Sequence, residues 1–295
     1  LVNEDNLLKS SWLFNRKVST SFIQKLPFGI SHVQQYLPLL PFAIEQLDLE
    51  GYPLVISSSH LVAKGVLTSP DQLHISYVHT PVRYAWDQMN IYLKRSFLRK
   101  IGLGPLIRWQ LHTLRQWDQL SSSRIDYLIA NSNFTAKRIW KYWKRPAEVL
   151  HPPVNVSRFK WDKPRDDFYL SVCRLVPNKR VDLLVRAFNR LQLPLTIVGD
   201  GPEKAYLKNL AGPTVQILGF QSTEKIEDLM SRSRAFVYAG IEDFGIAPVE
   251  AMASGAPVIA FGKGGVLDTV KCLNSNLDKG ATGLLFPAQT VKSLV

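Results

Sequence analysis

The fold is decided by one stretch of the chain, AFVYAGIEDFGIAPVE at residues 235–250. It opens with a short apolar run of strand length and continues into a glycine-containing loop that carries Glu242 and Asp243. Pro248 then suits the first turn of a helix. A short apolar strand, a polar loop and a helix in this order are typical of a parallel α/β sheet, in which ligands bind beyond the carboxyl ends of the strands.

The same order of strand and helix recurs through the second half of the chain. We expect strands at 168–172, 195–198, 215–218, 235–238, 257–260 and 283–286. Between them we expect helices near 181–191, 203–210, 223–231 and 247–253. Because the strands are short, apolar and separated by helices, they predict a parallel sheet that is covered on both faces.

The first half of the chain shows a similar series. We expect strands at 54–56, 75–78 and 127–130 and helices at 105–120 and 135–142. Ser132 suits the cap of the second of these helices, whereas the pattern of the first 51 residues fits helix and loop equally. The segment HPPV at 151–154 cannot extend a central strand and predicts a linker. A chain of 295 residues is about twice a typical domain, so we expect two domains, 1–150 and 151–295.

Composition excludes several classes of protein. Apolar residues make up 46% of the chain and charged residues 20%, which excludes disordered, collagen-like and low-complexity sequences. No stretch is long and apolar enough to span a bilayer, and the first thirty residues lack the pattern of a signal peptide. Cys173 and Cys272 are too few for a disulfide framework and lack zinc-site spacing, which fits a reducing cytosol. We therefore expect a cytoplasmic protein, free or at the inner face of the membrane.

Positive charge is concentrated in one segment. The formal net charge is +12, and residues 83–145 hold 13 Lys or Arg against three acidic residues. Five of the seven tryptophans lie in the same segment. A basic, indole-rich surface suits anionic lipid head groups, and it also suits nucleic acid. The alternative is that the tryptophans are core residues and the charges form a solvated helix face.

Charged and glycine-rich residues follow several of the predicted strands. Arg174 and Lys179 can both reach a phosphate group near a helix N-terminus, although each alone is typical of a surface charge. Glu242 and Glu250 are eight residues apart, so both carboxylates can face one cleft; the alternative for an isolated pair is a loop acid and a helix-dipole partner. The glycine turn at 262–265 is a second candidate phosphate cradle, and its spacing excludes a Walker A loop.

These motifs together resemble a known family. The second half resembles the donor domain of retaining GT-B glycosyltransferases of family 4, also called glycosyl transferase group 1, through Arg174 and Lys179, GDGP at 199–202, the Glu242-x7-Glu250 pair, Gly264-Gly265 and GLLF at 283–286. The first half looks like the acceptor domain of a mannosyltransferase-like subgroup through YVHTPVRYAWD at 77–87 and NSNFT at 131–135. Asp268 departs from the pattern, because family members usually carry Glu at its position.

The resemblance implies a fold of two Rossmann-like α/β domains whose parallel sheets face a central cleft. Residues 1–150 would bind the acceptor and residues 151–295 the nucleotide-sugar donor. Leu1 is not preceded by Met, and Val295 follows shortly after the start of an expected helix at Thr290. We therefore expect the acceptor domain to be incomplete at its start and the donor domain at its end.

The resemblance also implies four catalytic side chains: His79, Arg174, Lys179 and Glu242. Arg174 and Lys179 would neutralise the donor diphosphate as it leaves, which stabilises the transition state electrostatically. Glu242 would hold hydroxyl groups of the sugar. His79 would face the donor sugar from the acceptor domain.

Binding residues follow from the same resemblance. Glu250 would accept hydrogen bonds from the ribose hydroxyls, and the turn at 219–220 would border the base. The full donor-binding set is Gly199, Gly219, Phe220, Phe244, Gly245, Ile246, Ala247, Glu250, Gly264 and Gly265. The acceptor side is assigned Arg83, Tyr84, Trp86 and Asp87.

We therefore expect a hexosyltransferase that uses a nucleotide diphosphate sugar, with GDP-mannose favoured, and a glycan or lipid-linked oligosaccharide as acceptor. The donor preference rests on subgroup resemblance, so a UDP-sugar is the alternative. A basic nucleic-acid-binding protein is a less favoured alternative, and a dehydrogenase ranks last because no GxGxxG motif follows a strand. No metal is expected, because no DxD pair follows a strand and two cations are available for the diphosphate.

Overall fold

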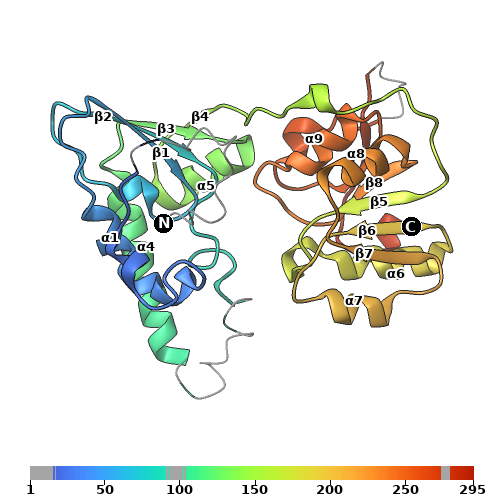
Figure 1. The fold of residues 1–295 in the computed structure, drawn as a ribbon, viewed down its shortest axis with the longest axis horizontal. Helices are drawn as coiled ribbons and strands as arrows, with labels where there is room; N and C mark the ends of the chain where they lie inside the picture. Colours follow the sequence, from blue (N-terminus) through green and yellow to red (C-terminus); the bar gives the residue numbers. More distant parts are fainter. Residues whose placement is uncertain (1–15, 17, 91–92, 94–101, 103, 274–279) are drawn as a thin grey trace. The chain divides into compact units, whose positions relative to one another are not determined.

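The computed structural model describes residues 16, 18–90, 93, 102, 104–273 and 280–295 (Figure 1). Contacts between residues divide the chain into two units, Leu1–Leu150 and His151–Val295, which we call the first and the second unit. The division falls at the proline-containing linker expected from the sequence. Each unit is an α/β fold built on one parallel sheet.

The sheet of the second unit has six parallel strands in the order β10-β9-β8-β5-β6-β7. The strands are β5 (Tyr169–Val172), β6 (Leu195–Val198), β7 (Val215–Gly219), β8 (Ala235–Tyr238), β9 (Val258–Phe261) and β10 (Gly283–Phe286). Every one lies within one residue of the range predicted from its apolar run. Because β5 and β8 are paired, the loops that follow them lie side by side.

Helices cover both faces of this sheet, as predicted. One core, around Leu184 and Val237, includes α6 (Val181–Leu191), α7 (Lys204–Leu210) and α11 (Val291–Leu294). The other core, around Leu170 and Phe236, includes α8 (Thr223–Arg232), α9 (Ile246–Ala253) and α10 (Val266–Thr269). In Figure 1, α6 and α7 lie on one side of the sheet and α8 and α9 on the other. Consecutive residues of β8 enter different cores, because strand side chains alternate between faces.

The first unit has a four-stranded parallel sheet in the order β1-β2-β3-β4. Its strands are β1 (Leu54–Ser59), β2 (Leu73–Val78), β3 (Tyr127–Ala130) and β4 (Glu148–Val149). The first three were predicted, and the two-residue β4 is too short to give a periodic signal. Side chains of β1 alternate strictly, with Val55 buried and Ile56 67% exposed.

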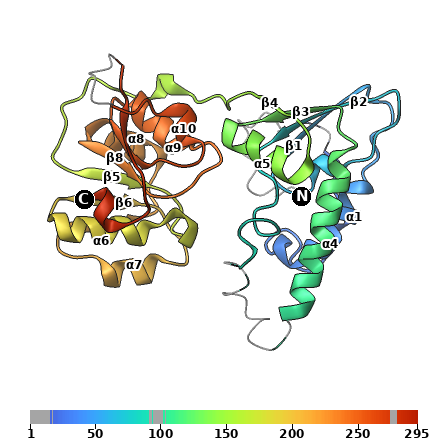
Figure 2. The same cartoon turned by 180° about the vertical axis from the view of Figure 1, so that it is seen from behind.

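Two long helices support this sheet and the loop after β2 (Figure 2). They are α4 (Gly104–Ser122) and α5 (Asn133–Trp143), both close to their predicted ranges. Ser132 caps α5 as expected, with its hydroxyl accepting the N–H of Thr135 at 3.0 Å. The shorter helices, in a region whose pattern was ambiguous, are η2 (Phe22–Lys25), η3 (Val33–Leu39) and α1 (Leu40–Glu45), and η4 (Ala63–Gly65) follows β1.

Candidate active site

Three side chains meet beyond the carboxyl end of the second unit's sheet. Glu242 follows β8, and its Oε1 atom contacts the ammonium group of Lys179 and accepts a hydrogen bond from the hydroxyl of Tyr238. Lys179 ends the 3-10 helix η6 (Pro177–Lys179), which follows β5. The pairing of β5 with β8 thus brings a cation and an anion to one point. The sequence placed Lys179 and Glu242 at the same sheet edge, and the structure joins them directly.

Glycines permit the close approach of the loops that follow β5, β8 and β9. A Cβ atom on Gly240 would lie 3.1 Å from the Cα atom of Lys179. Gly264, with φ at +95°, would place a Cβ atom 2.5 Å from the carbonyl oxygen of Glu242. Gly265 donates its N–H to that carbonyl at 2.9 Å. The turn after β9 therefore packs on the backbone of Glu242, in space that a side chain would fill.

A buried cysteine lies close to the charged pair. Burial raises the pKa of the Cys173 thiol to about 12; the charge of Glu242 acts in the same direction, and that of Lys179 opposes it. The thiol is therefore protonated at neutral pH and is a poor nucleophile.

The loop after β6 packs tightly against the end of β5. Gly199 has φ at +139°, and a Cβ atom there would lie 1.9 Å from the carbonyl oxygen of Cys173. Leu175 donates its N–H to the carbonyl of Asp200 at 2.9 Å, which ties the two loops together. Arg174, between Cys173 and Leu175, is exposed. Gly199 and Arg174, both assigned to the donor, therefore lie on adjoining strand ends.

The next strand end carries an exposed aromatic residue. Gly219 ends β7 with φ at +78°, and Phe220 follows it with 81% of its surface exposed. Gly199 donates its N–H to the carbonyl of Gly219 at 2.9 Å, so the ends of β6 and β7 are also joined. The turn predicted to border the base therefore presents an aromatic ring to solvent.

Glu250, on α9, pairs with a cation that the sequence did not indicate. Arg158, at the end of η5 (Val156–Arg158), donates through Nη2 to Glu250 Oε1 at 2.7 Å, and its Nε atom lies 3.2 Å from Glu227 Oε1. Burial raises the pKa of Glu250, the charge of Arg158 lowers it, and that of Glu227 raises it. The Arg158 contact fixes the Glu250 carboxylate in one orientation.

The loop between Glu242 and α9 gives the helix a defined start. Gly245 caps α9 with φ at +95°, and Phe244 before it is buried. The ring of Phe244 lies 5.4 Å from that of His151, whose Nε2 is 3.4 Å from Asp268 Oδ2. The first N–H groups of α9, at Ile246 and Ala247, have no partner within the helix and are suited to sugar or phosphate oxygens.

In the first unit, His79 follows β2 directly, at the sheet end where it was predicted. Its Nε2 lies 2.8 Å from the hydroxyl oxygen of Ser58, and its ring packs edge-on against Tyr77 at 5.3 Å between centroids. Asn131 donates from Nδ2 to the His79 carbonyl at 3.1 Å. Both the ring and the backbone of His79 are therefore held by neighbouring strand ends.

Two of the four acceptor-side residues are engaged inside the first unit. Trp86 donates its indole N–H to Asp118 at 2.8 Å and stacks on Tyr142 at 4.6 Å between centroids. Asp87 accepts a hydrogen bond from Arg138 at 3.1 Å. These contacts assign Trp86 and Asp87 at least a structural part, because their polar groups bond to buried neighbours.

The other two acceptor-side residues, Arg83 and Tyr84, are half-buried. Tyr84 lines a largely apolar cavity of about 950 Å³ that α1 and α4 also line. Ser58 and His60, at the end of β1, lie in its wall. Through Ser58, the cavity wall is in contact with His79.

Among the residues that the structure describes, no group of three or more His, Cys, Asp or Glu side chains could hold a metal ion. Within the same part of the chain, no helix is long and apolar enough to cross a membrane.

Residues 154–295 match the family model described as Glycosyl transferases group 1. This range contains every strand-end residue of the second unit from Arg174 to Gly265. Residues 154–295 are a glycosyltransferase group 1 domain. The group 1 domain therefore includes the contact between Lys179 and Glu242 and the pair formed by Arg158 and Glu250.

Curated relatives extend the similarity into the first unit. The chain is 34% identical over 235 residues to the GDP-mannose-dependent alpha-mannosyltransferase of Mycobacterium tuberculosis, covering 75% of this chain and 59% of the relative. It is 27% identical over 232 residues to Alpha-1,3/1,6-mannosyltransferase ALG2 of Saccharomyces cerevisiae, covering 59% of this chain and 46% of the relative. The chain thus spans about half the length of these curated relatives.

Solved structures share the fold. Anabaena Alr3699/HepE in complex with UDP and glucose matches with a TM-score of 0.59 at 18% identity, covering 95% of this chain and 73% of that chain. TarM matches with a TM-score of 0.62 at 15% identity, covering 87% and 49% respectively. The likeness confirms the predicted α/β fold with two parallel sheets, as found in GT-B structures.

Sequence reasoning missed two residues of the group 1 domain. Tyr238 ends a fully buried strand, and only its hydroxyl at that position could have signalled a polar partner. Arg158 lies 92 residues before Glu250 in a stretch without periodic pattern, so no local signal connects them.

Proposed function

We propose that the chain belongs to a retaining glycosyltransferase that transfers a hexose from a nucleotide diphosphate sugar to an acceptor hydroxyl. In this reaction the bond between the anomeric carbon and the phosphate oxygen breaks, and a bond between the anomeric carbon and the acceptor oxygen forms. The proton of the acceptor hydroxyl passes to an oxygen of the leaving diphosphate. The contact between Lys179 and Glu242 within the group 1 domain carries the proposal. It sets a cation for the leaving diphosphate beside a carboxylate for the sugar hydroxyls.

Several features prepare this pair for the donor. The Tyr238 hydroxyl and the turn at Gly264 and Gly265 fix Glu242 before any sugar binds. An arriving diphosphate then competes with Glu242 for the ammonium group of Lys179. Arg174, which like Lys179 follows β5, supplies a second cation. With two cations at the diphosphate, transfer needs no divalent metal.

GDP-mannose is the favoured donor. The printed name of the Mycobacterium tuberculosis relative, GDP-mannose-dependent alpha-mannosyltransferase, supports this choice. Glu250, held by Arg158, is the acceptor for the ribose hydroxyls, and the exposed ring of Phe220 borders the base. A UDP-sugar is the second candidate, because the structurally similar Alr3699/HepE was solved in complex with UDP and glucose.

The acceptor is a glycan or a lipid-linked oligosaccharide, bound by the first unit around His79, Arg83 and Tyr84. Exposure separates the tryptophans of the basic segment into two groups. Trp86, Trp117 and Trp143 are buried or half-buried, whereas Trp109 is 64% and Trp140 58% exposed. Trp140 lies on α5 with exposed Lys137, Lys141 and Lys144 around it. This face suits peripheral contact with an anionic membrane.

Calorimetry with GDP, UDP, ADP and their sugars tests the donor, and a transfer assay tests the reaction. GDP is expected to bind most tightly, and Glu242→Gln is expected to preserve the fold while cutting turnover at least about 100-fold. Full activity in this variant would contradict the proposal. A steep loss of nucleic-acid affinity with salt, without nucleotide binding, would favour a nucleic-acid-binding protein instead.

A further inference from the structure

Two arginine side chains, one half-buried and one buried, bond to the loop that joins His79 to Asp87. Arg115, on α4, donates from Nη1 to the carbonyl of Ala85 at 2.9 Å. Arg138, on α5, donates from Nη2 to Asp87 Oδ1 at 3.1 Å and also contacts the hydroxyl of Thr80. Both ends of the loop are therefore tied to helices of the first unit.

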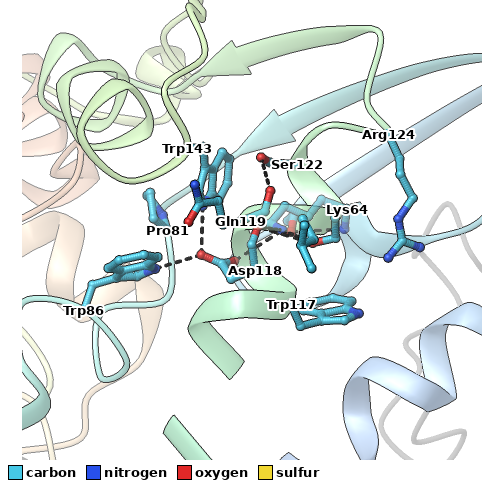
Figure 3. A network of polar contacts seen from close by, with 12 residues as sticks. Lys64, Pro81, Trp86, Trp117, Asp118, Gln119, Ser122, Arg124 and Trp143 are labelled. Atoms are coloured by element: carbon cyan, nitrogen blue, oxygen red, sulfur yellow. Dashed lines mark hydrogen bonds and ion pairs between the residues drawn. The ribbon is translucent and has the colours of Figure 1, made fainter. Parts of the chain in front are cut away.

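Asp118 provides the most deeply buried of these ties (Figure 3). Its exposed fraction is 0%, and its Oδ2 atom accepts indole N–H groups from Trp86 and Trp143, each at 2.8 Å. Figure 3 shows the two indoles directed at one carboxylate oxygen from different parts of the chain. Trp86 belongs to the loop, whereas Trp143 ends α5. The Oδ2 atom of Asp118 therefore connects the loop to both α4 and α5.

A buried lysine balances the charge of Asp118. Lys64 Nζ lies 3.2 Å from Asp118 Oδ1 and donates to the Asp118 carbonyl at 2.7 Å. The same ammonium group lies 5.0 Å from the ring centroid of Trp117 and 4.7 Å from that of Trp143. Burial lowers the pKa of Lys64, and the charge of Asp118 opposes this. Replacing a buried ion pair with apolar residues is often neutral or stabilising, so its presence points to a requirement for fixed geometry.

The indole of Trp86 is fixed in two independent ways. Its N–H bonds to Asp118, and its face stacks on Tyr142 with an interplanar angle of 12°. Loss of the N–H leaves the stacking but removes the bond that sets the ring's direction. Trp86 lies three residues after Arg83 and two after Tyr84, so these two contacts anchor the stretch of backbone that carries both.

We propose that Asp118 is a positioning residue: through the indole N–H of Trp86 it fixes the loop that carries His79, Arg83 and Tyr84 for the acceptor. The inference rests on the proposed function and assigns a role to residues that touch neither donor nor acceptor. A displacement of about 1 Å at such a loop can cost 100-fold in rate. Trp86 would then act from inside the unit and not by contact with substrate.

The chain offers a matched pair of variants, Trp86→Phe and Trp143→Phe. Both remove an indole N–H from the same oxygen of Asp118 at the same distance, but only Trp86 lies in the loop. Each would be assayed with GDP-mannose as donor and octyl α-mannoside as acceptor. The melting temperature, the Kd for GDP and the acceptor KM and kcat would be measured for both.

We expect both variants to have a lower melting temperature than the unaltered chain and the same Kd for GDP. Trp86→Phe is expected to lower kcat/KM for the acceptor at least tenfold, and Trp143→Phe less than threefold. Equal losses in the two variants would show a general structural role and overturn the proposal, as would unchanged kinetics in Trp86→Phe. Asp118→Asn, which keeps an oxygen to accept the indole N–H, should retain more acceptor activity than Asp118→Leu, measured below both melting temperatures.

Hydrogen exchange tests the positioning without any transfer. Backbone amides of residues 80–87 should exchange at least tenfold faster in Trp86→Phe than in the unaltered chain, and Trp143→Phe should leave them within threefold. Unchanged exchange in Trp86→Phe would overturn the proposal. If the unaltered chain transfers no sugar but the loop still responds in this way, the proposed function fails while the positioning role of Asp118 stands.

Discussion

The two units share one architecture but keep their charged groups in different places. Among the described residues of the second unit, the buried polar side chains are four serines, Ser171, Ser231, Ser233 and Ser254. The first unit buries Lys64, His74, Asp118 and Arg138 as well as several hydroxyl groups. Among the described residues, the second unit therefore keeps charged side chains out of its buried core. The first unit uses buried charges to hold a loop. Removing a charged side chain should therefore lower mainly the stability of the first unit, whereas in the second unit it should lower mainly the rate of transfer.

The largest effect is expected from Asp118→Leu. This change leaves the buried ammonium group of Lys64 without its counter-ion, which costs about 3 to 5 kcal/mol of the free energy of unfolding. The first unit should melt at a lower temperature while GDP binding by the group 1 domain persists, seen as two transitions in calorimetry. The double variant Lys64→Met/Asp118→Leu should recover most of the loss. A simultaneous loss of GDP binding would show that the two units do not differ in this way.

In the second unit a charge can be removed with little loss of stability but a large loss of rate. Lys179→Ala should raise the transition-state free energy by about 2 to 4 kcal/mol, because an electrostatic contact to the leaving diphosphate is lost. Lys163→Ala, which removes a surface partner of Asp228, is the control and should leave kcat unchanged. A change confined to acceptor KM in Lys179→Ala would contradict its place at the diphosphate.

A smaller effect is expected from Tyr238→Phe. The variant loses the hydroxyl that orients Glu242, worth about 1.5 kcal/mol or roughly tenfold in kcat. Its ring remains packed in the core, so the melting temperature should change little. Tyr206→Phe, which removes an exposed hydroxyl beside Arg186, serves as the control. Equal kcat values for the two variants would exclude an orienting role for Tyr238.

The smallest effect concerns pH. The pKa of Glu250 is raised in the folded state by burial, against the charge of Arg158. Above 4.5, the ordinary pKa of a glutamate side chain, the folded chain therefore binds more protons than the unfolded chain. The free energy of unfolding should therefore fall as pH rises through the window from 4.5 to the raised pKa. Urea unfolding across this window should show the slope in the unaltered chain and a weaker slope in Glu250→Gln. Identical slopes in the two chains would show that Glu250 does not cause this pH dependence.

The sequence predicted those parts of the molecule that depend on local pattern. Apolar runs located the strands of the second unit to within one residue, and the rule that ligands meet strand ends brought Lys179 and Glu242 together. Contacts between distant segments were not predictable in this way. The bond from Trp86 to Asp118 spans 32 residues and that from Lys64 to Ser121 spans 57, so both depend on how α4 packs.

The amino-acid composition of the basic segment, residues 83–145, left more than one interpretation open. Five tryptophans in a basic segment suggested either a binding surface or a core, and the structure shows that some of them are exposed and the others buried or half-buried. Trp140 lies exposed among lysines, while Trp143, only three residues later, is buried against Asp118. Residues three apart lie at neighbouring positions on one face of a helix, so which of the two is buried depends on how the helix packs on the sheet beneath it.

The protonated thiol beside the charged pair has a consequence for oxidative chemistry. With a pKa of about 12, Cys173 is ionised in about one molecule in 10⁵ at pH 7. Peroxide and alkylating reagents react with the thiolate, so they should modify Cys173 far more slowly than an ordinary thiol. Reagents directed at thiols should therefore leave the contact between Lys179 and Glu242 undisturbed, because Cys173 close to it stays unmodified.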